Sequence, residues 1–350
     1  MALSKIDTTN MIEDVPQSKL DNNINFRNII INGDMSIAQR GTSATGLGNG
    51  DTGYHTCDRW QFSEGGTPTY EFTMSQSTDV PTGQGFAKSL KMDCTTAQAS
   101  LGSADNLRIP QKVEGQNLQY VKKGTSNAES LTCSFWVKSN KTGTYIVELY
   151  DNDNTRQISK SYTISSADTW EKKTITFAGD TTGTLDNDNS ASLTMQFWLN
   201  AGTDWSSGTL STSWDSATSA NRAVGQVNLA DSTSNEWYIT GVQLEAGTTA
   251  SDFEFLPVDV NLQRCQRYCN AIMNYGSGNA VGNQLHALRF NTGASFAKKD
   301  IPTMRTTPTL SYGITGGTVD TDYSAPDFIS LYDGNDISWW IYDVLAEAEL

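Results

Sequence analysis

The sequence predicts an all-β protein with a large antiparallel β-sandwich, a short helix and a small second β domain. Three observations lead to this prediction. Aromatic residues make up 10% of the 350 residues and are interspersed with many Gly, Ser, Thr, Asn and Asp residues, a composition typical of strands joined by short polar turns. Several runs alternate apolar and polar residues with a period of two. A helical period follows only after Pro257.

Four runs show the alternation most clearly, at residues 131–140, 142–150, 191–200 and 236–247. Each is bounded by residues that favour turns, and no helical pattern separates them, so they predict an antiparallel sandwich. In the last run, Tyr238, Val242 and Leu244 are expected to share one face. The long polar connection at 200–236 is expected to be functional or to pack over the edge of the core.

The domain boundaries follow from changes in composition and period. Residues 1–25 are polar and acidic, which is typical of a tether or docking segment. The sandwich is expected at 26–256 and a linking helix at 257–274, where apolar residues recur at helical spacing. A small C-terminal β domain is expected at 275–350, including a hairpin that turns at 333–336.

The formal net charge of −15 disfavours a main role in binding nucleic acid or anionic membrane. The sequence contains no run of about 18 apolar residues, so no membrane-spanning helix is predicted. The first residues do not have the pattern of a secretory signal. The five Cys residues lack metal-ligand spacing. They are expected to be reduced, mostly buried thiols of a protein made in a reducing cytoplasm.

Several motifs occur in a characteristic order and together resemble bacteriophage tail-fibre and related virion proteins. They are NIIINGDMSIAQRG (28–41), CDRW (57–60), RIPQKVEGQNL (108–118), SFWVKS (134–139), WYITGVQLEAG (237–247), RCQRYC (264–269) and MRTTPTL (304–310). The central domain of such proteins is a jelly-roll sandwich similar to carbohydrate-binding modules. The resemblance implies a virion protein made in the bacterial host cytoplasm, attachment to other virion proteins through residues 1–25, a homotrimer, and contact with host-surface polysaccharide.

Three functions remain open on this basis. The first is a non-enzymatic phage fibre, most simply a tail fibre, which binds host-surface glycan. The second is a capsid decoration or head-fibre protein without receptor binding. The third is a polysaccharide depolymerase, for which the acidic loop 150–156 would supply carboxylates. No catalytic motif or cofactor fingerprint accompanies this loop, so we expect the protein not to be an enzyme.

The long connection contains the candidate glycan site. Trp205 and Trp214 offer flat aromatic faces for the C–H groups of a sugar ring. Asp204, Asp215 and Asn221 lie close to them in sequence and offer hydrogen bonds to hydroxyl groups. The alternative is that both indoles fold back over the end of the sandwich.

Two further sites are considered. Asn32, Asp34 and Glu245 form a candidate structural calcium site, because oxygen ligands suit this ion; no other cofactor is expected. Asp58, Arg59 and Trp60 are a second candidate glycan site. Their structural interpretation is that Arg59 pairs with a carboxylate, Trp60 enters the core and Asp58 caps a turn.

Overall fold

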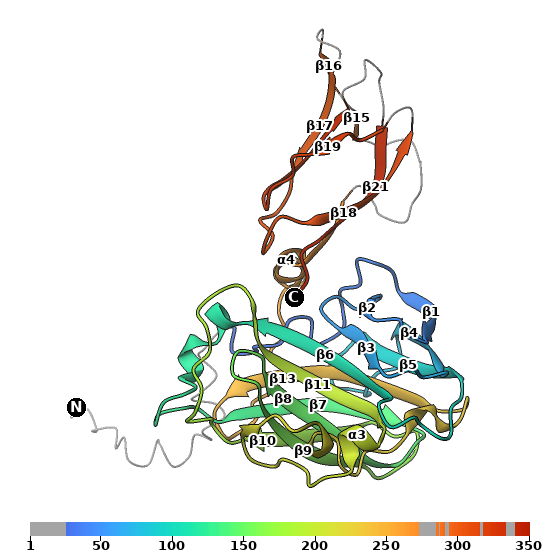
Figure 1. The fold of residues 1–350 in the computed structure, drawn as a ribbon, viewed down its shortest axis with the longest axis vertical. Coiled ribbons are helices and arrows are strands. Elements are labelled where there is room, and N and C mark those ends of the chain that lie inside the picture. Colours follow the sequence, from blue (N-terminus) through green and yellow to red (C-terminus); the bar gives the residue numbers. More distant parts are fainter. Residues whose placement is uncertain (1–25, 273–284, 287, 291–293, 316–317, 334–339) are drawn as a thin grey trace, which may run out of the picture.

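The structure is a computed structural model that describes residues 26–272, 285–286, 288–290, 294–315, 318–333 and 340–350. It confirms an all-β protein. A large β-sandwich carries a smaller C-terminal unit on one side, and helix α4 (Val258–Gln266) and the last residues lie at the junction (Figure 1). The expected tether at 1–25 lies outside the described residues. None of the helices within them is long and apolar enough to cross a membrane.

The sandwich consists of two antiparallel sheets between which the chain crosses repeatedly, as in a jelly roll. In spatial order, the first sheet contains β1 (Ser43–Gly48), β4 (Glu71–Ser77), β5 (Ser89–Thr96), β13 (Glu236–Ala246), β7 (Leu131–Ser139) and β10 (Glu171–Phe177). The second contains β12 (Asp215–Ser216), β9 (Arg156–Ile164), β8 (Gly143–Asp151), β11 (Ala191–Ala201), β6 (Asn106–Glu114), β3 (Gln61–Gly65) and β2 (Gly53–Tyr54). The four runs that the sequence singled out are β7, β8, β11 and β13.

The core lies between the inward faces of the two sheets. Phe135 of β7 and Phe197 of β11 are completely buried, and their ring centroids lie 5.0 Å apart. Trp60 also belongs to this core, as its structural interpretation predicted. Burying a side chain of this size stabilises the fold by about 1.5–3 kcal/mol, so the alternating aromatic residues account for much of the sandwich's stability.

Strand β13 contains a bulge that changes which residues face the core. Its register with β7 shifts between Thr240 and Gln243, and Gly241 has φ of 62°. Trp237 therefore faces the core before the bulge, and Val242 does so after it. The prediction that Tyr238 shares a face with Val242 and Leu244 is wrong, because simple alternation does not continue through a bulge.

Two sheets form the C-terminal unit. The first has β14 (Cys269–Ile272), β21 (Trp340–Glu347) and β15 (Leu285–His286) in order, with β18 (Thr309–Thr315) also paired to β21. The second has β16 (Leu288–Phe290), β17 (Ala294–Asp300), β20 (Phe328–Asp333) and β19 (Thr321–Asp322). A separate core cluster lies within this unit and includes Ile329 and Ile341.

The C-terminal unit differs from the sequence prediction in two respects. The linking helix predicted for 257–274 ends at Gln266, and residues 269–272 form strand β14 instead. The predicted hairpin around 333–336 is wrong, because its two strands, β20 and β21, belong to different sheets. These segments have the apolar content that the prediction assumed. The sequence pattern of a segment does not show which strand it pairs with.

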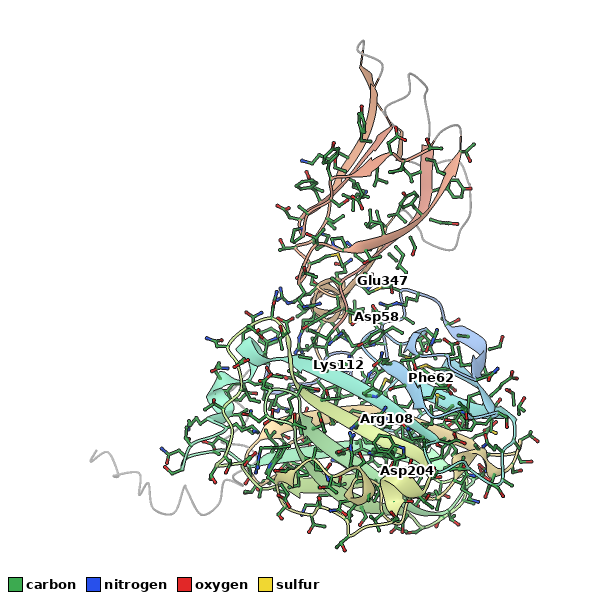
Figure 2. The ribbon with its side chains drawn as sticks, viewed as in Figure 1. Asp58, Phe62, Arg108, Lys112, Asp204 and Glu347 are labelled. Atoms are coloured by element: carbon green, nitrogen blue, oxygen red, sulfur yellow. The ribbon has the colours of Figure 1, made fainter. Side chains whose placement is uncertain are left out.

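A buried set of ion pairs, here called the seam, joins this unit to the sandwich. Arg40 lies 2.7 Å from Glu347 and 3.0 Å from Glu349, and Arg59 also pairs with Glu349. The guanidinium of Arg59 stacks 3.5 Å from the ring centre of Tyr268. Glu347 lies at the junction of the two parts, with Asp58 of the sandwich below it (Figure 2). The seam confirms the structural interpretation of Arg59.

The bulge predicts a difference between two glycine substitutions. We expect Gly241→Ala to lower the free energy of unfolding by about 2–4 kcal/mol, because left-handed backbone is unfavourable for alanine and the new Cβ would lie 2.5 Å from Cζ of Phe86. Gly46→Ala is the matched control. Gly46 also has positive φ, 69°, but no neighbour within 4 Å, so about 1–2 kcal/mol is expected. Equal losses in urea unfolding would contradict this account.

Candidate binding site

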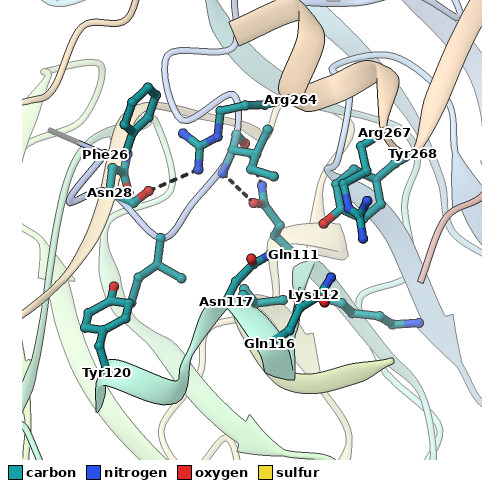
Figure 3. A pocket seen from close by; sticks show the side chains of 13 residues that line it. Phe26, Asn28, Gln111, Lys112, Gln116, Asn117, Tyr120, Arg264, Arg267 and Tyr268 are labelled. Atoms are coloured by element: carbon teal, nitrogen blue, oxygen red, sulfur yellow. Dashed lines mark hydrogen bonds between the residues drawn. The ribbon is translucent and has the colours of Figure 1, made fainter. Parts of the chain in front are cut away.

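A pocket of about 540 Å³, here called the α4 pocket, opens where three distant segments meet (Figure 3). One wall is the chain leading into the sandwich, the second is the end of β6 with the short helices η2 (Gly115–Asn117) and η3 (Gln119–Val121), and the third is α4. Its described lining is Phe26, Asn28, Ile29, Ile31, Gln111, Lys112, Val113, Gln116, Asn117, Tyr120, Arg264, Arg267 and Tyr268.

Helix α4 is held against the sandwich by an apolar cluster and by hydrogen bonds. Cys265 and Tyr268 pack with Ile31 and Ile37 of the N-terminal segment. On the same helix, the side-chain amide of Asn261 donates to Asp34 and Ser36 at 3.2 and 3.0 Å. The helical spacing read from the sequence therefore does place Cys265 on the buried face, and this fixes the direction of the neighbouring Arg264.

Glu114, at the end of β6, anchors the other side of the helix. Its carboxylate accepts hydrogen bonds from Nε and a terminal nitrogen of Arg267, at 2.8 and 2.7 Å, and another from the hydroxyl of Tyr268. Burial raises the pKa of Glu114, but these hydrogen bonds outweigh it and hold the pKa below its ordinary value. Glu114 is therefore ionised at neutral pH and its charge is matched by Arg267.

Three other lining residues carry polar groups that the protein leaves largely unused. Tyr120 is 49% exposed, and Asn117 is exposed beside it. Arg264 makes one hydrogen bond, 3.3 Å long, to the carbonyl oxygen of Asn28, and has no ion-pair partner in the described part of the chain. Figure 3 shows Arg264 and Tyr120 on opposite walls of the pocket. An aromatic face, an amide and a guanidinium thus remain available to a ligand.

A smaller pocket of about 310 Å³ lies on the outer face of the first sheet. Trp136 of β7 lines it together with Phe86, Phe253 and Phe255, and the three phenyl rings pack with centroids 4.8–5.1 Å apart. Phe86 covers Gly241 of the bulge. The aromatic residues that follow β13 in the sequence therefore cover the outer face of this sheet.

The predicted glycan residue Trp205 lies in α3 (Thr203–Ser206), over the outer face of the second sheet. Its indole nitrogen donates to the carbonyl oxygen of Ala104 at 2.9 Å, and its ring lies 5.7 Å from that of buried Trp198. Beneath it, Arg222 pairs with the buried carboxylate of Glu148 at 2.8 Å. The long connection thus packs over the sheet, as the sequence suggested.

Trp214 has different neighbours from Trp205. Its indole nitrogen donates to the carbonyl oxygen of Ala178 at 2.7 Å, its ring packs against the main core, and Nζ of Lys123 lies 5.2 Å from the ring centre. Neither indole lines the α4 pocket. Both fold back onto the sandwich while remaining partly exposed, so a contribution to glycan binding stays a prediction.

The polar residues predicted beside the two indoles accept hydrogen bonds from other residues of the protein. Asp204 accepts from Ser103 at 3.4 Å, Asp215 accepts from the backbone of Ser216 at 2.8 Å, and Asn221 accepts from the backbone of Thr209 at 2.9 Å. In the acidic loop, buried Asp151 pairs with Lys123. Asp204 and Asp215 remain exposed, so a contribution of these residues to glycan binding stays a prediction.

The candidate calcium residues also have protein partners. The side chain of Asn32 bonds to backbone groups of Ile37 and Asp58, and Glu245 accepts from Gln243 and Ser251. Asp34 accepts from Ser36 and Asn261. Within the described residues, no group of three or more His, Cys, Asp or Glu side chains is arranged to hold a metal ion. All five Cys are buried and free, as predicted.

Sequence reasoning missed the α4 pocket. Its walls come from segments near residues 26–31, 111–120 and 264–268, which are far apart in the chain. Each segment overlaps one of the quoted motifs, NIIINGDMSIAQRG, RIPQKVEGQNL and RCQRYC in that order. The one signal available in the sequence was the aromatic Tyr120, two residues after RIPQKVEGQNL.

Comparisons with known proteins give weak structural similarities. No family model matches the sequence, and no curated protein sequence matches it. The enzymatically active domain of tailspike protein 4 from bacteriophage CBA120 aligns with 13% identity and a TM-score of 0.33 over 63% of this chain, but over 21% of the tailspike chain. At this TM-score the similarity supports no inference about ligand or activity.

Two carbohydrate-binding modules are similar to the same limited degree. TmCBM61, solved in complex with β-1,4-galactotriose, has 10% identity and a TM-score of 0.32 over 63% of this chain and 99% of its own. The family 11 module from Clostridium thermocellum, solved with a β-1,3-1,4-mixed-linked tetrasaccharide, has 10% identity and a TM-score of 0.28 over 60% and 98%. The function is therefore argued from the site itself.

The packing of the two indoles predicts how their removal changes the stability of the protein. We expect Trp205→Ala and Trp214→Ala each to lower the free energy of unfolding by about 2–4 kcal/mol, because each deletes a partly buried ring from its packed neighbours. Chemical denaturation measures the loss, and glycan binding is measured on the same samples. A variant that keeps wild-type stability but loses glycan binding would instead support the predicted binding role.

Proposed function

We propose that the protein is a non-enzymatic component of a bacteriophage particle that binds host-surface glycan through the α4 pocket. The observation that carries this proposal is the set of unused groups in the pocket: the exposed ring of Tyr120, the amide of Asn117 and the guanidinium of Arg264. A ring face packs against the C–H groups of a sugar, and amide and guanidinium groups hydrogen-bond to its hydroxyls. Few, well-placed polar groups beside an aromatic surface are typical of small-ligand sites.

The described lining favours binding over catalysis. It contains no Asp, Glu, His, Ser or Cys residue, whereas glycoside hydrolysis generally needs two carboxyl groups on opposite sides of the bond. Glu114 lies behind the wall with its oxygens bound to Arg267 and Tyr268. A depolymerase would have to use groups elsewhere in the chain.

The virion role rests on the ordered motifs that resemble tail-fibre and related virion proteins. In this proposal residues 1–25 attach the protein to the particle, most simply as a tail fibre. Several copies, expected as a homotrimer, then present their pockets together. Weak contacts at each pocket add through effective concentration, so a single site of modest affinity suffices for attachment.

The role of Tyr120 is tested by a pair of tyrosine substitutions. We expect Tyr120→Ala to weaken binding to host-surface glycan roughly 10-fold, the amount that loss of one aromatic stacking contact of about 1.5 kcal/mol gives. Tyr323→Ala is the control, because Tyr323 is similarly exposed, at 55%, but lies in the C-terminal unit. Glycan arrays followed by calorimetry on the full chain measure both.

Each outcome of that experiment favours one function. Binding that falls with Tyr120→Ala and not with Tyr323→Ala supports the proposal. Equal effects of the two variants would contradict the assignment of this pocket. No binding of the wild-type protein to any host glycan would favour the alternative of a capsid decoration or head-fibre protein. Release of new reducing ends would show an enzyme.

A further inference from the structure

The charges that line the α4 pocket are unbalanced. Its described lining contains three cationic residues, Lys112, Arg264 and Arg267, and no carboxylate. Arg267 is neutralised by Glu114, and Nζ of Lys112 donates to the oxygen of Leu350 at 2.7 Å. Arg264 remains without a described counter-charge. This is unusual in a chain with a net charge of −15, where acidic partners for an arginine are plentiful.

Arg264 is also partly removed from water. Burial lowers its pKa below the ordinary value, and the nearby groups that favour its charge, Glu254 among them, do not make up the difference. Glu254 has a different cationic partner, since it lies 4.0 Å from Arg27, and its oxygens also accept from the backbone of Phe26 and Asn28 at 2.6 and 2.9 Å. The free protein therefore holds a guanidinium whose lost hydration no ion pair offsets.

The guanidinium of Arg264 has enough free N–H donors to form two hydrogen bonds to one anion. An arginine has five N–H donors in a planar fork, and Arg264 uses one of them, for the carbonyl of Asn28. The others are available to a planar carboxylate or to a phosphate, which arginine binds through two parallel hydrogen bonds. Tyr120 on the opposite wall provides the apolar contact surface.

We propose that the α4 pocket selects a saccharide that carries an anionic group, a carboxylate or a phosphate, and that Arg264 binds this group directly. This inference rests on the proposed glycan-binding function and specifies its ligand class. The sugar ring lies against Tyr120, the amide of Asn117 bonds to a hydroxyl, and the anionic substituent neutralises Arg264. A neutral saccharide of the same shape leaves the partly buried guanidinium of Arg264 without a counter-charge.

The test compares matched acidic and neutral ligands on the full-length protein. The probes are oligogalacturonate, the neutral galactose oligomer of the same length, and a phosphorylated hexose oligomer, measured by calorimetry. We expect the wild-type protein to prefer the acidic probes roughly 10- to 100-fold, the range for a charge-assisted hydrogen-bonded pair. Comparing carboxylate with phosphate probes distinguishes the two sources of the anion.

Three variants identify the group responsible. Arg264→Gln should remove the preference, because it weakens binding of the acidic probes far more than binding of the neutral oligomer. Arg264→Lys, which keeps the charge but loses the fork, should keep an intermediate preference. Lys298→Gln removes the same charge from an exposed position in the C-terminal unit and should change nothing. If Arg264→Gln does not fold, the wild-type preference and the lysine variant decide the question.

The outcomes separate this inference from the function on which it rests. Equal affinity for neutral and acidic oligomers, or a preference that survives Arg264→Gln, would overturn the inference and leave glycan binding in place. Failure of every saccharide to bind would overturn the proposed function as well. A preference lost equally in Lys298→Gln would show non-specific attraction to charge and would also overturn the inference.

Discussion

The arrangement of the two parts depends on one buried cation, the guanidinium of Arg59. This side chain is 1% exposed, and a charge so placed is tolerated only when partners surround it. Glu349 supplies the opposite charge, Tyr268 stacks 3.5 Å away, and the backbone oxygen of Lys112 accepts a hydrogen bond at 2.7 Å. Those partners come from the end of the chain, the end of α4 and strand β6. A single desolvated group therefore specifies how the sandwich, the helix and the C-terminal unit meet.

The α4 pocket is a consequence of that arrangement. Tyr268 contacts Arg59 on one side and donates to Glu114 on the other. Arg267 next to it completes the pairing with Glu114, so the end of the helix cannot turn without breaking charged hydrogen bonds worth about 1.5–3 kcal/mol each. Arg264, one turn earlier in the helix, is thereby directed into the space beside Tyr120. The chain's own ion pairs thus neutralise Arg267 and leave Arg264 to the pocket.

The sequence predicted the elements that obey a simple period and missed those that depend on pairing. Runs such as 131–140 and 191–200 alternate regularly and are strands, because one face of each meets the core. In β13 the bulge at Gly241 reverses the faces, and nothing in a single strand's pattern locates a bulge. Cys269 continued the helical spacing of Cys265, yet it lies in β14, because pairing with β21 outweighs local propensity there. Sequence analysis missed the α4 pocket for a related reason. Trp205 and Trp214 stood out as isolated aromatics in a polar loop, whereas Tyr120 and Arg264 are separated by more than a hundred residues and are brought together by the packing of α4 against the sandwich.

Ligand binding and the docking of the C-terminal unit are therefore linked. A ligand that touches both Tyr120 and Arg264 binds only when α4 is seated against β6, because Arg264 belongs to the helix and Tyr120 to the sandwich. Such a ligand stabilises the seated arrangement by RT ln(1 + [L]/Kd), about 2.7 kcal/mol at a concentration of one hundred times Kd. A change that unseats α4 in part of the molecules raises the apparent Kd, which equals the intrinsic Kd divided by the fraction of molecules that remain seated. The contacts that seat α4 thus set how well the pocket is formed before any ligand arrives. They are the apolar cluster around Cys265, the hydrogen bonds of Glu114 to Arg267 and Tyr268, and the seam.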